Sequence, residues 1–159
     1  MSPPIAFGRP ADRELVASLD IEPDPADIQA IVAGLLDFNQ QHTGDDAPAQ
    51  LVASLRDGEG ALVGGLFGAT YLGWLYVHSF WLPEAMRGQG HGRRLLALAE
   101  QEAQRRGCPR AFLETLSFQA LGFYEKCGYR IASKLDGFPP GGARYALTKA
   151  LDEPVSTAS

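Results

Sequence analysis

Apolar residues recur along this chain with two different periods, one typical of helices and one typical of strands. Between residues 25 and 36 they return every three or four positions, which gives a helix one apolar face. Asp24 can cap the start of that helix, and Pro25 suits its first position. The pattern therefore predicts a helix that begins next to Asp24.

Two further helices are indicated by the same period and by the glycines that follow it. Residues 92–106 place apolar side chains on one side and charged ones on the other. Gly107 follows this segment, and Gly128 follows a shorter one over residues 120–127. Glycine is favoured just after a helix because it adopts the left-handed conformation without strain. Both segments are predicted helices.

The remaining apolar segments are short or alternate with period two, so they predict strands. They cover residues 15–19, 50–56, 61–70, 71–82, 111–115, 129–135 and 143–151. Glycine-bearing turns near residues 57–60 and 72–73 join three of them into an antiparallel meander. The order of elements predicts one mixed α/β sheet of seven strands flanked by helices. We expect a single domain over residues 13–151, between a flexible leader, 1–12, and a flexible tail, 152–159.

Composition narrows the class of protein. The chain has 159 residues, 45% of them hydrophobic, and a net charge of −5. An acidic balance argues against a general nucleic-acid binder. No export signal opens the chain, and the apolar stretch over 61–82 holds glycines with strand periodicity, so we expect a cytoplasmic protein that does not bind membranes. Cys108 and Cys127 lack metal-site spacing, so no metal is expected.

A glycine-rich turn is the most informative segment. Residues 87–94 contain three arginines and three glycines. The turn follows a predicted strand and opens a predicted helix, an arrangement in which backbone N–H groups and the helix dipole bind an anion. The spacing fits neither the dinucleotide-binding fingerprint nor the nucleotide-binding P-loop. We therefore expect a cradle for a pyrophosphate of another kind.

The spacing Arg87-x-x-Gly90-x-Gly92 resembles the acetyl-coenzyme A signature of the GNAT superfamily of N-acetyltransferases. A second segment, residues 117–129, resembles that family's other signature. Its matching positions are Ala120, Tyr124, Glu125, Lys126 and Gly128. Ser117 stands where the family usually has Asn, and Tyr129 where it usually has Phe.

The resemblance implies a GNAT fold, in which a mostly antiparallel central sheet splays open between two strands and takes the arm of acetyl-CoA, the cosubstrate. The backbone N–H near Leu82 would then polarise the thioester carbonyl. The residues implied in cofactor binding are Phe80, Trp81, Leu82, Arg87, Gly88, Gln89, Gly90, His91, Gly92, Arg93, Ser117 and Tyr124.

The resemblance also suggests catalytic residues. Tyr124 matches the family's general acid, which protonates the leaving thiolate. An alkylammonium must lose a proton before it reacts, and His78 can accept a proton because a histidine has a pKa near 6.5. A histidine bonded to a backbone carbonyl is an equally good interpretation of His78, and Glu114 is the second candidate base.

The leading hypothesis is an N-acetyltransferase that acts on a primary amine of a small cationic molecule. Acidic and aromatic residues in the variable segments favour a cation: Phe38, Asp45, Asp46, Asp136, Phe138 and Tyr145. A protein or peptide N-acetyltransferase and a non-catalytic acyl-CoA-binding module are the alternatives. A homodimer is possible.

Overall fold

The computed structural model describes residues 15–44 and 47–152. These residues divide into two compact units, one ending at Phe38 and the other beginning at Asn39. The predicted domain, 13–151, spans both units and remains a prediction. The predicted leader and all but the first residue of the predicted tail, like Asp45 and Asp46, lie outside the described residues.

Helix α1 (Pro25–Thr43) begins where the sequence predicted. The Ala26 N–H donates to Asp24 Oδ1 at 2.9 Å, so Asp24 caps the helix. The strand predicted over residues 15–19 is wrong, because this segment forms no strand. Its apolar side chains at positions 15, 16 and 19 are 82–87% exposed. A strand is stable only beside a partner, and none of the described strands pairs with this segment.

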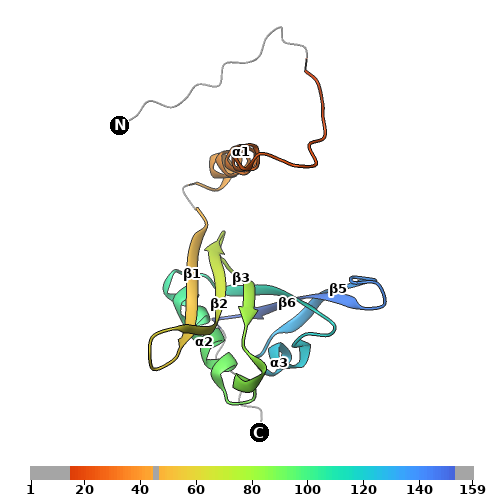
Figure 1. Cartoon of the computed structure of the whole chain (residues 1–159). Coiled ribbons are helices and arrows are strands. Elements are labelled where there is room, and N and C mark those ends of the chain that lie inside the picture. The colour runs from red at the N-terminus through yellow and green to blue at the C-terminus, as the bar shows by residue number, and fades with distance from the viewer. Residues whose placement is uncertain (1–14, 45–46, 153–159) are drawn as a thin grey trace. The chain divides into compact units, whose positions relative to one another are not determined.

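The second unit is built on one six-stranded sheet (Figure 1). Its strands are β1 (Ala49–Arg56), β2 (Leu62–Tyr71), β3 (Trp74–Trp81), β4 (Arg110–Leu116), β5 (Arg130–Asp136) and β6 (Ala143–Ala150). Their spatial order is β1-β2-β3-β4-β6-β5, and every neighbouring pair is antiparallel except β3 and β4. The sequence predicted seven strands, one too many, because the segment 15–19 forms none. The mixed α/β architecture is confirmed.

A tight turn joins β2 to β3 where the sequence predicted one. Leu72 and Gly73 both have positive φ, 49° and 78°. Two successive residues of this kind form the hairpin turn whose twist matches that of the flanking strands.

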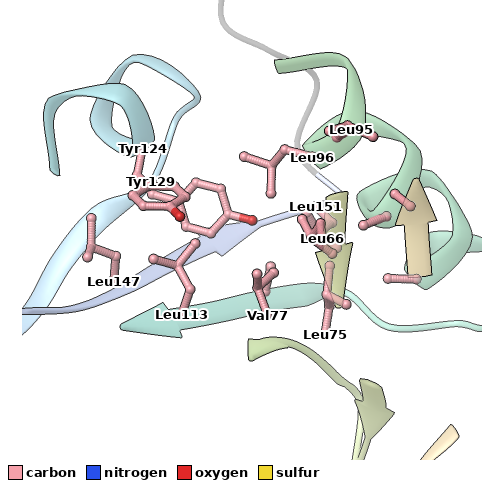
Figure 2. Packing of buried hydrophobic residues seen from close by; sticks show 14 of the residues in the cluster. Leu66, Leu75, Val77, Leu95, Leu96, Leu113, Tyr124, Tyr129, Leu147 and Leu151 are labelled. Carbon is pink, nitrogen blue, oxygen red and sulfur yellow. The ribbon is translucent and has the colours of Figure 1, made fainter. Parts of the chain in front are cut away.

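Helices α2 (His91–Arg105) and α3 (Leu121–Lys126) pack on the same face of the sheet, around one core (Figure 2). The largest fully buried side chains come from β2, β3, α2, β4 and β6: Leu66, Leu75, Leu96, Leu113 and Leu147. Burying each leucine contributes about 1.5–3 kcal/mol. This core fixes α2 and α3 against the centre of the sheet, where the two parallel strands lie.

The sheet opens between β3 and β4. Their ladder runs only from Trp74↔Arg110 to Val77↔Leu113. Strand β3 continues to Trp81 and β4 continues to Leu116. Beyond the last pair the two strands diverge, which leaves a fork in the middle of the sheet.

Candidate active site

The glycine-rich turn forms a backbone cradle at the start of α2. A short 3-10 helix (Glu84–Met86) precedes it. Gly88 and Gly90 have φ of 72° and 85°, and Gly90 is the residue that caps α2. A residue with a Cβ is strained at such backbone angles, whereas glycine adopts them freely. The N–H groups of the first helical turn have no partner within the helix, so they are available to an anion.

Two side chains brace this cradle from behind. Arg87 Nε donates to the carbonyl of Leu82 at 3.0 Å, and Gln89 Nε2 donates to the carbonyl of Ala85 at 2.8 Å. Arg87 thus ties the end of β3 to the turn, in addition to supplying charge. The sequence predicted the charge but not this contact.

Arg93 lies apart from that brace. It lines a groove of about 750 Å³ whose other walls come from α3 and from β5 and β6. Lys126 and Lys149 line the same groove. Glu100 and Glu125 also line the groove, and Glu100 pairs with Lys149 at 2.8 Å, so both signs of charge lie beside the first turn of α2.

Gly92 stands where little room is left for a side chain. A Cβ at this position would lie 3.2 Å from the Phe123 ring and 3.4 Å from Leu82 Cδ1. The absence of a side chain lets α2 approach α3 and the end of β3 closely. This contact joins the cradle to the helix that carries Tyr124.

A bulge in β3 changes which side chains share a face. Phe67 of β2 pairs with Ser79 and Gly68 pairs with Val77, so His78 is an extra residue. A strand that alternates strictly, as the sequence pattern suggests for residues 71–82, would place His78 and Phe80 on one face, and the bulge shows this to be wrong. Phe80 packs against the core, whereas His78 contacts rings on the opposite face, with centroids 5.2 Å from Phe67 and 4.1 Å from Tyr76.

Gly68 permits the bulge, since a Cβ there would lie 2.6 Å from the Tyr76 carbonyl oxygen. Backbone cannot move aside cheaply, so Gly68→Ala should destabilise the fold by about 1–3 kcal/mol. Gly58→Ala is the matched control, because nothing lies within 4 Å of that site. Denaturant unfolding compares the two variants. Equal stability of the variants would show that this contact does not restrict β3.

The two candidate bases each follow the last ladder pair at the fork. Val77↔Leu113 is the last pair of the ladder, and His78 and Glu114 are the next residues on the two strands. Leu113 belongs to the core, so Glu114 faces the opposite side, as His78 does. The Glu114 carboxylate accepts a hydrogen bond from Arg144 Nη2 of β6 at 2.5 Å, with its side chain 27% exposed.

Tyr124 occupies the core side of the fork. Its ring centroid lies 6.4 Å from Phe80, 5.2 Å from Phe123 and 6.0 Å from Tyr129. Burial, and then the neighbouring Cys127, raise the pKa of Tyr124 to about 12. The phenol therefore keeps its proton near neutral pH.

Ser117 links β4 to β6 next to the fork. Its Oγ accepts from the Ala143 N–H at 3.1 Å, while its own N–H donates to the Ala143 carbonyl at 2.8 Å. The hydroxyl proton remains to donate. Gln119, which sequence reasoning missed, holds the end of β4 through a bond of 2.8 Å from the Leu116 N–H to its Oε1.

Comparison with known proteins decides the family. The model of the acetyltransferase (GNAT) family matches residues 14–129. The chain belongs to the GNAT family.

Two curated relatives are similar over much of their length. Acetyltransferase Atu2258 of Agrobacterium fabrum is 41% identical over 120 residues, which cover 76% of this chain and 85% of that protein. Blasticidin-S acetyltransferase of Streptomyces morookaense is 42% identical over 106 residues, covering 65% and 78%. A crystal structure of an Agrobacterium tumefaciens protein assigned as an acetyltransferase superposes with a TM-score of 0.81 at 35% identity, covering 86% of this chain and 99% of that one.

As a GNAT acetyltransferase, the protein uses acetyl-CoA. Its geometry fits that cosubstrate, because the glycine-rich turn at the start of α2 would hold phosphates and the fork beside it would take an extended arm. No cluster of metal-ligating residues occurs in the part of the chain that the structure describes. Among the same residues, no helix is long and apolar enough to cross a membrane.

Proposed function

We propose that this GNAT acetyltransferase transfers the acetyl group of acetyl-CoA directly to a primary amine of a small molecule, with the donor and the acceptor on opposite faces of the fork. The observation that carries the proposal is the division of the candidate residues. Tyr124 and the cradle lie on the helix-covered face, while His78 and Glu114 lie on the other. The two substrates can therefore meet at the fork without competing for space.

On the donor side, the cradle residues would bind the phosphates. They are Arg87, Gly88, Gln89, Gly90, His91, Gly92 and Arg93. The backbone of β3 beyond Val77 is not paired with β4, so the main chain of Phe80, Trp81 and Leu82 can bond the cosubstrate's arm. An N–H near Leu82 would stabilise negative charge on the thioester oxygen. The Ser117 hydroxyl would donate to the arm from the opposite strand.

On the acceptor side, we assign the base to His78. It belongs to none of the ion pairs among the described residues, and its side chain is exposed. Glu114 remains the second candidate, but its carboxylate is already engaged by Arg144. The base takes a proton from the ammonium, which leaves the nitrogen lone pair free to attack.

The transfer then needs one acid. As the nitrogen forms its bond to the acetyl carbon, the carbon–sulfur bond breaks and the electron pair goes to sulfur. Tyr124 gives its hydroxyl proton to that sulfur, and the second proton, which the nitrogen loses as the amide forms, returns to the Tyr124 phenolate. Burial of Tyr124 suits this role, since a phenol with a raised pKa arrives protonated.

The relative that acetylates blasticidin S favours a small-molecule acceptor for this chain. A cationic acceptor is part of the proposal, as are a cytoplasmic location and a homodimer. A protein or peptide acceptor is the alternative, and it would need a long groove open along the acceptor face.

The cradle can be tested by binding alone. The double variant Arg87→Ala, Gly90→Ala should weaken acetyl-CoA binding at least tenfold, because it removes the brace and strains the left-handed residue at the cap. Calorimetry with acetyl-CoA and with desulfo-CoA measures the loss. Arg105→Ala is the matched control, since it removes an arginine from the far end of the same helix.

Two outcomes would contradict the proposal. If the wild-type protein binds neither compound, the proposed acetyl transfer is wrong. A double variant that binds as tightly as the control would mean that the phosphates bind elsewhere.

A further inference from the structure

We propose that the ion pair between Glu114 and Arg144 is a recognition site for the acceptor, and that it selects an amine that carries a carboxylate close by. The inference rests on the proposed acetyl transfer and narrows its acceptor from any small cation to an ammonium that has a carboxylate beside it. The sequence suggested Glu114 only as a base and indicated no role for Arg144. Their pairing depends on the register of β4 and β6, which brings together residues 30 positions apart.

The pair lies where an acceptor would have to bind. Glu114 is the first residue of β4 beyond the ladder with β3, on the face that also carries His78. Arg144 lies opposite Leu116 in the register of β4 and β6, two positions further along β4. The side chains of Glu114 and Arg144 are 27% and 33% exposed, so a ligand can reach both. A molecule that presents its amine to His78 would have the pair beside it.

The pair is held rigidly. The guanidinium carbon of Arg144 lies 4.9 Å from the centre of the Phe138 ring, which orients the guanidinium plane. The two hydrogen bonds between Ser117 and Ala143 fix β6 to the end of β4 at the neighbouring position. A guanidinium has five N–H donors, and the contact with Glu114 uses one of them. The others can bind a second carboxylate without moving the side chain.

The charges of the pair define the ligand. A plain polyamine would meet a carboxylate and a guanidinium together, so the arginine would offset the attraction. An ammonium next to a carboxylate would instead find an opposite charge for each group, and Arg binds carboxylates especially well. Asp136, which the sequence assigned to cation binding, is likewise paired, with Lys134 at 2.7 Å. The described acids around the β5–β6 hairpin therefore do not form an unbalanced negative patch.

Matched acceptors test this selectivity. Lysine and cadaverine differ by a carboxylate, as do tyrosine and tyramine. We expect the wild type to show at least tenfold higher kcat/KM for the carboxylated member of each pair, followed by release of free thiol from acetyl-CoA. Arg144→Gln should raise KM for lysine and tyrosine tenfold or more and so reduce the ratio, and Arg144→Lys should keep part of it. Lys134→Gln breaks the neighbouring pair and should leave the ratio unchanged.

A wild type that prefers cadaverine and tyramine, or that releases thiol with none of the four, would overturn the inference. So would an Arg144→Gln variant that loses thermal stability but keeps the wild-type ratio, because the pair would then serve only the fold. The proposed acetyl transfer is judged separately, by acetyl-CoA binding and by thiol release in a broader set of amines.

Discussion

Replacing Tyr124 with phenylalanine should lower kcat for acetyl transfer by about 10²–10⁴-fold, the usual effect of removing a general acid. Acetyl-CoA should bind the variant about as tightly as it binds the wild type. The change removes one hydroxyl and keeps the ring, whose contacts with Phe80, Phe123 and Tyr129 hold α3 against the sheet. A steady-state assay of thiol release, together with calorimetry, separates the loss of chemistry from a loss of binding.

The pH dependence sharpens this test. A general acid works only while it is protonated, and the pKa of Tyr124 is raised to about 12. Deprotonation of Tyr124 should therefore abolish activity only near pH 12, whereas a free phenol, with a pKa of about 10, would lose its proton earlier. Below that pH, any fall in kcat/KM toward acid reports the base, which must be unprotonated to act. If Tyr124→Phe retains full kcat, the leaving thiolate takes its proton from another source and the role of Tyr124 is packing.

Replacing Glu100 with alanine should destabilise the fold by about 3–5 kcal/mol, the range found when one partner of a buried ion pair is removed. Glu100 of α2 accepts from the Tyr129 hydroxyl at 3.0 Å and from Lys149 of β6 at 2.8 Å. The side chains of Glu100 and Lys149 are only 13% and 20% exposed. Without the carboxylate, the largely buried Lys149 ammonium would lose its ion pair and the buried Tyr129 hydroxyl would lose its acceptor.

The same network offers its own control. The triple variant Glu100→Leu, Lys149→Met, Tyr129→Phe replaces every polar group at once with an apolar group of similar size, so it should regain most of the lost stability. Glu102→Ala removes a carboxylate that is 31% exposed, more than twice as much as Glu100, from the same helix and should cost much less. Thermal and denaturant unfolding compare the three variants. A Glu100→Ala variant as stable as Glu102→Ala would mean that water replaces the carboxylate in the folded protein.

The stability of this network also bears on activity, because Tyr129 packs beside Tyr124. Their ring centroids are 6.0 Å apart, and the Tyr129 N–H donates to the Tyr124 carbonyl at 3.0 Å. Burial, and then Glu100, raise the pKa of Tyr129, so its hydroxyl stays protonated and acts as the donor. This chain has Tyr where the family usually has Phe, and the structure gives the extra hydroxyl a defined partner.

The sequence by itself predicted the three helices, the six strands of the sheet and the glycine-rich turn before α2, because these features leave local patterns along the chain. Periodicity predicted α2 and the strands, and Gly90 marks the left-handed residue at the start of α2. The prediction from local sequence failed at residues 15–19, where a segment of strand-like composition has no strand to pair with. Local sequence reports the preference of a segment, whereas a strand also needs a neighbour, which only the fold supplies.

The tertiary structure alone decided which side chains share a face at the fork. One extra residue in β3 puts His78 on the opposite side from Phe80, against the simple alternation of a strand. The Glu114–Arg144 pair arises from a ladder between strands that are distant in the chain. Register, bulges and pairing across a sheet are set by contacts between segments, so the separation of Tyr124 from His78 and Glu114 could not be predicted from the order of residues.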